Sequence, residues 1–136
     1  MRILIVDEYI AIGKVLKDYI AKYHPSFNIT FIYKLNLVNY YLENENYDVI
    51  VLNFGSFNNN RLLDNILKYN KKQKIVIIST DAKCTDQISC EHCKESYNKI
   101  RLISPFSLYN LMDYILNKEG QECPHYKHCD DFKFVI

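Results

Sequence analysis

The chain has 136 residues, of which 49% are hydrophobic and 24% are charged, and its formal net charge is +1. This length and composition are typical of one globular domain with a sizeable core. The small net charge gives no electrostatic reason to expect nucleic acid or an anionic membrane as a partner. No apolar run approaches the ~18 residues that span a bilayer, and the N-terminus is too short and too acidic for a signal peptide, so we expect a cytoplasmic protein.

Short apolar runs alternate with helical patterns along the chain. Strands are expected at 2–6, 28–33, 48–53, 74–79 and 100–103, and helices at 8–22, 36–44, near 60–70 and at 107–118. A cysteine-rich segment between the last two strands is expected to include a short helix. Such alternation of buried runs and helices predicts an α/β fold with a parallel sheet covered on both faces.

The helical patterns also predict which side chains point inward. In the helix expected at 8–22 the inner stripe is Ile12, Leu16, Tyr19 and Ile20. In the helix expected at 107–118 it is Leu108, Leu111, Tyr114 and Ile115. Both stripes follow the 3.6-residue helical period.

Polar residues end two of the expected strands. Asp7 and Glu8 follow the first strand, and Asn53 ends the third. Ligands of parallel sheets bind at the carboxyl ends of the strands, so these side chains mark the candidate site. The alternative is that Asp7 and Glu8 cap the following helix and complement its dipole. The chain has only three glycines, and none of them builds a glycine-rich phosphate loop after the first strand.

Four segments then carry a family resemblance. ILIVDE at 3–8, YDVIVLN at 47–53, KIVIIS at 74–79 and ISPF at 103–106 resemble, in order and spacing, the receiver domain of bacterial response regulators. The resemblance implies a five-stranded, doubly wound, flavodoxin-like sheet of order 2-1-3-4-5. It also implies a receiver-like domain at 1–118 and a C-terminal tail at 119–136 that packs on it.

A working receiver binds Mg²⁺ through acidic residues after its first strand and is phosphorylated on an Asp that ends its third strand. By this resemblance, Asp7 and Glu8 match the acidic pair, whereas Asn53 stands where the acceptor Asp should be. An amide oxygen is neutral and a poor nucleophile, and Mg²⁺ prefers charged hard oxygens. We therefore expect an inactive phosphoacceptor site, weak or absent Mg²⁺ binding and no enzymatic activity.

The residues that read phosphorylation in a receiver are only partly present. By the same resemblance, Ser79 matches the switch hydroxyl and Pro105 matches the proline of the fifth-strand motif. Ser104 stands where the Lys before that proline should be, and Arg101 falls at the switch aromatic. Without that Lys, the cation that would counter a phosphoryl charge is gone. Arg101 is expected near the altered pocket, where its guanidinium would pair with Asp7 or Glu8.

The five cysteines fall into two groups. These are Cys84, Cys90 and Cys93 in CTDQISCEHC, and Cys123 and Cys129 in CPHYKHC. In a cytosolic protein such spacing favours a metal over disulfides, and the receiver resemblance brings the two groups together near the fourth and fifth helices. We predict a structural Zn²⁺ that attaches the tail to the domain, with Cys90, Cys93, Cys123 and Cys129 as ligands. The alternates are Cys84, His92, His125 and His128.

Other states of these cysteines stay open. An iron–sulfur cluster uses the same four ligands, and free thiols or a disulfide need no metal. Our leading functional prediction is a degenerate receiver that works by protein–protein contact with a signalling partner, for which Tyr40, Tyr41 and Tyr109 are candidate contacts. The alternatives are a redox or metal sensor that uses the cysteines, and an active phosphoacceptor that uses Ser56 or Asp48. The sequence leaves the oligomeric state open.

Overall fold

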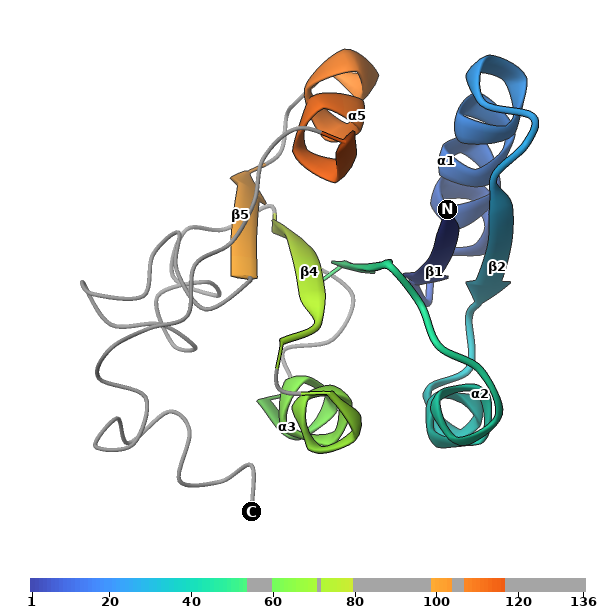
Figure 1. Ribbon diagram of the computed structural model, residues 1–136. Coiled ribbons are helices and arrows are strands. Elements are labelled where there is room, and N and C mark those ends of the chain that lie inside the picture. The colour runs from blue at the N-terminus through green and yellow to red at the C-terminus, as the bar shows by residue number, and fades with distance from the viewer. Residues whose placement is uncertain (54–59, 71, 80–98, 104–106, 117–136) are drawn as a thin grey trace.

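The computed structural model describes residues 1–53, 60–70, 72–79, 99–103 and 107–116 (Figure 1). The strands are β1 (Arg2–Val6), β2 (Asn28–Ile32), β3 (Val49–Asn53), β4 (Lys74–Ser79) and β5 (Lys99–Ile103). The helices are α1 (Ile10–Tyr23), the 3-10 turn η1 (Leu35–Leu37), α2 (Val38–Asn44), α3 (Asn60–Tyr69) and α5 (Leu108–Leu116). The short helix expected in the cysteine-rich segment lies outside these residues.

The strands form a parallel sheet in the order β2-β1-β3-β4-β5. Helices α1 and α5 cover one face of the sheet, and α2 and α3 cover the other (Figure 1). The predicted α/β class and parallel sheet are therefore confirmed. None of the helices among the described residues is long and apolar enough to cross a bilayer.

Side chains of each strand alternate between the two layers. In β1, Ile3 and Ile5 pack against α1 and α5, whereas Leu4 and Val6 pack against α2 and α3. All four are at most 1% exposed. Burial of such a side chain contributes about 1.5–3 kcal/mol each, so the central strands are a major source of stability. This two-sided burial explains why β1, β3 and β4 each contain an unbroken run of four Ile, Leu or Val residues.

Helix α1 lies unusually close to β2. A Cβ built on Gly13 would lie 2.1 Å from Cε1 of Phe31. The buried side of α1 therefore consists of Gly13, Leu16 and Ile20. The prediction that Ile12 belongs to the inner stripe is wrong, because Ile12 is 46% exposed. The close approach at Gly13 turns Ile12 away from the core.

The inner side of α5 also differs from the predicted stripe. Leu111, Met112 and Ile115 are buried, whereas Leu108 and Tyr114 are only partly buried. The thioether of Met112 takes an inward position because it adapts to irregular gaps between packed elements.

Candidate functional site

The candidate site lies at the carboxyl edge of the sheet, where β1 and β3 run side by side. Val6 of β1 pairs with Leu52 of β3, so the next residues along each strand, Asp7 and Asn53, are neighbours. Both side chains are buried, Asp7 at 0% and Asn53 at 7% exposure. The sequence prediction that these two strand ends form one site is consistent with this placement.

Asp7 is held at this position by both its backbone and its side chain. Its N–H donates to the carbonyl oxygen of Ile32 at 3.0 Å. Its Oδ1 accepts a hydrogen bond from the N–H of Tyr9 at 2.8 Å. Its Oδ2 accepts a hydrogen bond from Nδ2 of Asn53 at 2.9 Å. A carboxylate buried this deeply needs such donors, because an unpaired buried charge costs several kcal/mol.

The contact between Asn53 and Asp7 depends on the amide group. The NH₂ group donates to a carboxylate oxygen, whereas an Asp at position 53 would place a second acceptor there. Hydrogen bonds to a charged group contribute about 1.5–3 kcal/mol. The amide therefore stabilises the buried Asp7 carboxylate without adding charge to the site.

The two acidic residues after β1 have separate roles. Asp7 is buried, and Glu8 is exposed. The prediction that they cap α1 is wrong, because α1 has Tyr9 at its N-cap without a side-chain cap bond and has no acidic residue in its first turn. Asp7 instead forms an Asx turn with Tyr9, just before the helix begins.

The hydrogen bonds of Asp7 bear on the expectation that Mg²⁺ binds weakly or not at all, which stays a prediction. Each oxygen of Asp7 accepts a hydrogen bond from an N–H group, and one of these donors is the side chain at the position of the second expected ligand. Mg²⁺ requires near-octahedral oxygen ligands at about 2.0–2.1 Å. In this arrangement the side chain at position 53 directs its NH₂ group, and not an oxygen ligand, at Asp7 Oδ2.

The backbone positions of two further predicted site residues are described. Ser79 ends β4 at the same edge of the sheet, one residue beyond Ile78, which pairs with Asn53. Arg101 lies in β5, the edge strand, where it pairs with Ile77 of β4. Three strand spacings separate β5 from β1, which places their backbones about 14 Å apart, and the pairing of Arg101 with Asp7 or Glu8 stays a prediction.

Other predicted site residues lie outside the described part of the chain. These are Ser56, Ser104, Pro105, Cys84, Cys90, His92, Cys93, Cys123, His125, His128 and Cys129. Within the described ranges, no group of three or more His, Cys, Asp or Glu side chains is arranged to hold a metal ion. The zinc site and the Ser56 alternative therefore stay predictions.

Asp48 lies at the opposite edge of the sheet from Asn53. It precedes β3, and its Oδ2 accepts a hydrogen bond from the N–H of Arg2 at 2.7 Å. Asp48 is therefore separate from the Asp7 site, and the alternative that it accepts a phosphoryl group stays a prediction. Parallel strands place residues 48 and 53 at opposite ends of β3, about five residues or 16 Å apart.

A polar cluster that the sequence did not predict lies near Asp48. Nη2 of Arg2 lies 2.8 Å from Oε2 of Glu45, and the hydroxyl of Tyr47 donates to the same oxygen at 3.0 Å. Burial of the ring, together with the Glu45 carboxylate, raises the pKa of Tyr47 to about 12. The contacts join β1 to the segment before β3 at the amino edge, so we assign this cluster to stability.

Solved structures with the same fold include several receiver domains. The receiver domain of a Francisella response regulator has a TM-score of 0.65 and 21% identity, with 84% of this chain and 92% of that chain covered. A response regulator receiver domain protein from Clostridium thermocellum has a TM-score of 0.70 and 17% identity, with 86% and 92% covered.

A third similar structure contains a metal. The receiver domain of the sensor histidine kinase PA1611 from Pseudomonas aeruginosa, with a magnesium ion coordinated in its active site cleft, has a TM-score of 0.66 and 15% identity, with 86% of this chain and 95% of that chain covered. No family model and no curated protein matches the sequence. The chain thus has the fold of response regulator receiver domains.

Proposed function

We propose that this chain is a receiver-type signalling module that does not accept a phosphoryl group and acts through protein–protein contact. The observation that carries the proposal is the 2.9 Å hydrogen bond from Asn53 Nδ2 to Asp7 Oδ2. In this arrangement the side chain at the acceptor position is engaged as a hydrogen-bond donor. A neutral amide is also a poor nucleophile toward phosphorus, which a carboxylate oxygen can attack.

The proposed role in two-component signalling rests on the fold and on the four matching segments of sequence. Similar structures include receiver domains of response regulators and of a sensor histidine kinase. The site itself differs from the one that the resemblance implies, because an amide replaces the acceptor carboxylate. Ser104 in place of Lys removes the countercharge for a phosphoryl group. Two separate requirements of phosphorylation are therefore absent. This supports loss of the whole reaction, because a chance change at a single position would remove only one of them.

The direct test is exposure of the purified full chain to a small phosphodonor such as acetyl phosphate, with Mg²⁺, followed by intact mass measurement. We expect no phosphoryl adduct on the parent protein, under conditions in which a known receiver is modified. Omission of the phosphodonor controls for other adducts. A stoichiometric adduct that peptide mapping assigns to the carboxyl edge of the sheet would overturn the proposal.

We also propose that a Zn²⁺ ion attaches the tail at 119–136 to the domain, with Cys90, Cys93, Cys123 and Cys129 as ligands. The support is the spacing of the cysteines, since CxxC spacing lets two thiolates bind one ion. Metal analysis of anaerobically purified protein tests this proposal, and we expect about one zinc per chain. Absence of stoichiometric metal would refute it. Iron with sulfide would favour a cluster instead.

The same preparation separates a binding module from a redox or metal sensor. In the proposed module, thiol oxidation or zinc removal changes the stability of the chain but not its choice of partner. A sensor would instead gain or lose a partner on the same treatment. Partner capture with reduced, oxidised and chelated protein distinguishes these outcomes.

A further inference from the structure

Helix α1 has more apolar surface than the core uses. One side, which includes Leu16 and Ile20, is buried against the sheet. Four further large apolar side chains remain exposed, namely Ile10, Ile12, Val15 and Tyr23, and the last three lie on the same side of the helix by its 3.6-residue period. A helix that packs only on its own sheet needs one apolar stripe and presents polar residues elsewhere. The additional apolar side of α1 therefore suggests a second contact surface.

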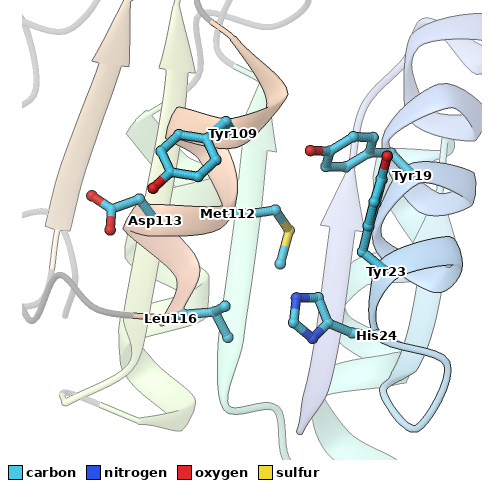
Figure 2. A pocket seen from close by; sticks show the side chains of 7 residues that line it. All are labelled: Tyr19, Tyr23, His24, Tyr109, Met112, Asp113 and Leu116. Atoms are coloured by element: carbon cyan, nitrogen blue, oxygen red, sulfur yellow. The ribbon is translucent and has the colours of Figure 1, made fainter.

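Helix α5 lies beside α1 and also has a stripe of apolar side chains. Tyr109, Met112 and Leu116 follow a spacing of three and four residues, which places them on one side of the helix. Tyr109 is 74% exposed and Leu116 is 37% exposed, whereas Met112 is buried. Figure 2 shows these side chains across a hollow from Tyr19, Tyr23 and His24. This hollow, the α1–α5 groove, has a volume of about 320 Å³.

Both walls of the α1–α5 groove are held in place without a partner. The ring of His24 stacks on Phe27, with centroids 4.6 Å apart and planes 9° apart. At the end of α5, Nζ of Lys74 donates to the carbonyl oxygen of Ile115 at 2.7 Å. A groove whose walls are already ordered loses less conformational entropy on binding.

The two helices carry opposite charge. Helix α1 contains three lysines and one aspartate, which gives it a net charge of +2, whereas Asp113 is the single charged residue of α5. Lys22 lies with its Nζ 5.6 Å from the centre of the Tyr23 ring, and Asp113 lines the groove on the other side. A surface with one basic and one acidic half is complementary to a copy of itself rotated by a two-fold axis.

We propose that the α1–α5 groove is the interface of a homodimer, in which α1 of each copy packs against α5 of the other. In this arrangement Lys22 faces the partner's Asp113, and the exposed Tyr109 enters the partner's groove. Tyrosine and methionine are enriched in interface cores, and tyrosine is a frequent hot-spot residue. The proposal does not depend on the chemistry of Asn53.

The size of the surface sets the expected strength. The 14 residues of α1 extend about 21 Å, and two adjacent helices are together about 20 Å wide. A patch of this size lies at the low end of specific interfaces, which bury about 800 Å² per partner. The expected dimer is therefore weak, with a dissociation constant near the micromolar range, and it exchanges with monomer as the concentration changes.

Sedimentation velocity of the full chain under reducing conditions tests the proposal. Between about 5 and 500 µM we expect a reversible shift from monomer to dimer. Tyr109→Asp should raise the dissociation constant about 30-fold, as expected for loss of a hot-spot residue. The matched control is Tyr40→Asp on α2, at a position that is 61% exposed on the other side of the sheet, and it should leave the dissociation constant unchanged.

Charge reversal provides the second test. Asp113→Lys should weaken the dimer, and addition of Lys22→Asp in the same chain should restore it, because the pair is reversed across the two-fold axis. Both positions are exposed, so the fold is retained, which circular dichroism checks. A monomer at all concentrations would refute the homodimer. Equal weakening by Tyr40→Asp, or no restoration in the double variant, would refute this interface.

Discussion

Replacement of Asn53 by Asp is the most informative perturbation of the candidate site. In the parent, Nδ2 of Asn53 donates to Asp7 Oδ2 at 2.9 Å in a buried setting. Asn53→Asp removes this donor and places a second carboxylate beside the first. The loss of a hydrogen bond to a charged group costs about 1.5–3 kcal/mol. Two carboxylates this close cannot both ionise freely, so one of them retains its proton at a raised pKa.

The proton that one carboxyl group retains sets the sign of the change in stability and its dependence on pH. At pH 7 the folded variant must either retain this proton or ionise next to a like charge, and both lower its stability relative to the unfolded chain. We therefore expect Asn53→Asp to lower the free energy of unfolding by about 3 kcal/mol at pH 7. The loss should be smaller at pH 5, because the folded variant can retain its proton and the pH is closer to the carboxyl pKa of the unfolded chain. Urea unfolding at the two pH values measures this difference.

Magnesium distinguishes this explanation from general misfolding. Two adjacent carboxylates provide hard oxygen ligands that one carboxylate and an amide NH₂ group do not. At about 10 mM Mg²⁺ and a dissociation constant of about 1 mM, binding would restore about 1.4 kcal/mol to Asn53→Asp. Asn53→Leu is the control, since it removes the donor without adding a carboxylate and should not respond to Mg²⁺. Equal stability of Asn53→Asp and the parent at pH 7 without Mg²⁺ would refute the reasoning.

Three further predictions concern the rest of the fold. Gly13→Ala should destabilise the protein by about 1–2 kcal/mol, because its Cβ would overlap the Phe31 ring, and Phe31→Leu in the same chain should recover most of the loss. The pKa of Tyr47 is about 12 in the folded chain, whereas an unfolded chain loses this proton near pH 10. The free energy of unfolding should therefore fall as the pH rises between these values, and it should fall less steeply in Tyr47→Phe. Gln73→Leu should cost about 1–3 kcal/mol, because the buried Nε2 donates to the carbonyl oxygens of Tyr47 at 3.1 Å and Lys74 at 3.2 Å.

Thermal and urea unfolding measure all three predictions, and each has its own contrary outcome. A Gly13→Ala protein as stable as the parent would show that α1 can move away from β2. Identical alkaline unfolding of Tyr47→Phe and the parent would show that this hydroxyl does not titrate with folding. A Gln73→Leu protein as stable as the parent would show that solvent reaches the two carbonyl oxygens.

The sheet was predictable from the sequence because its signal is local and strong. The runs at 3–6, 49–52 and 75–78 consist of Ile, Leu and Val, and the structure buries them on both faces. The neighbouring positions of Asp7 and Asn53 followed from the same argument, since parallel strands bring their carboxyl ends to one edge. These predictions needed only the pattern of apolar residues and the order of the strands and helices along the chain.

Side-chain orientation was not predictable in the same way. Ile12 fits the helical period, but the contact between Gly13 and Phe31 selects a different inner side of α1. Glu8 follows Asp7 directly, yet it is exposed because the chain turns at Tyr9. The Asn53–Asp7 bond joins residues 46 positions apart, so no local pattern specifies which amide atom faces the carboxylate.

The measurement that tests the central claim most directly is an Mg²⁺ titration of the parent protein followed in the ¹H–¹⁵N spectrum of the Asn53 side-chain amide. If this amide holds Asp7 Oδ2, its protons exchange slowly with solvent, and their resonances stay in place at millimolar Mg²⁺. A saturable shift of these resonances, with faster exchange as the amide turns away from Asp7, would show that the site binds the cation and would contradict the account.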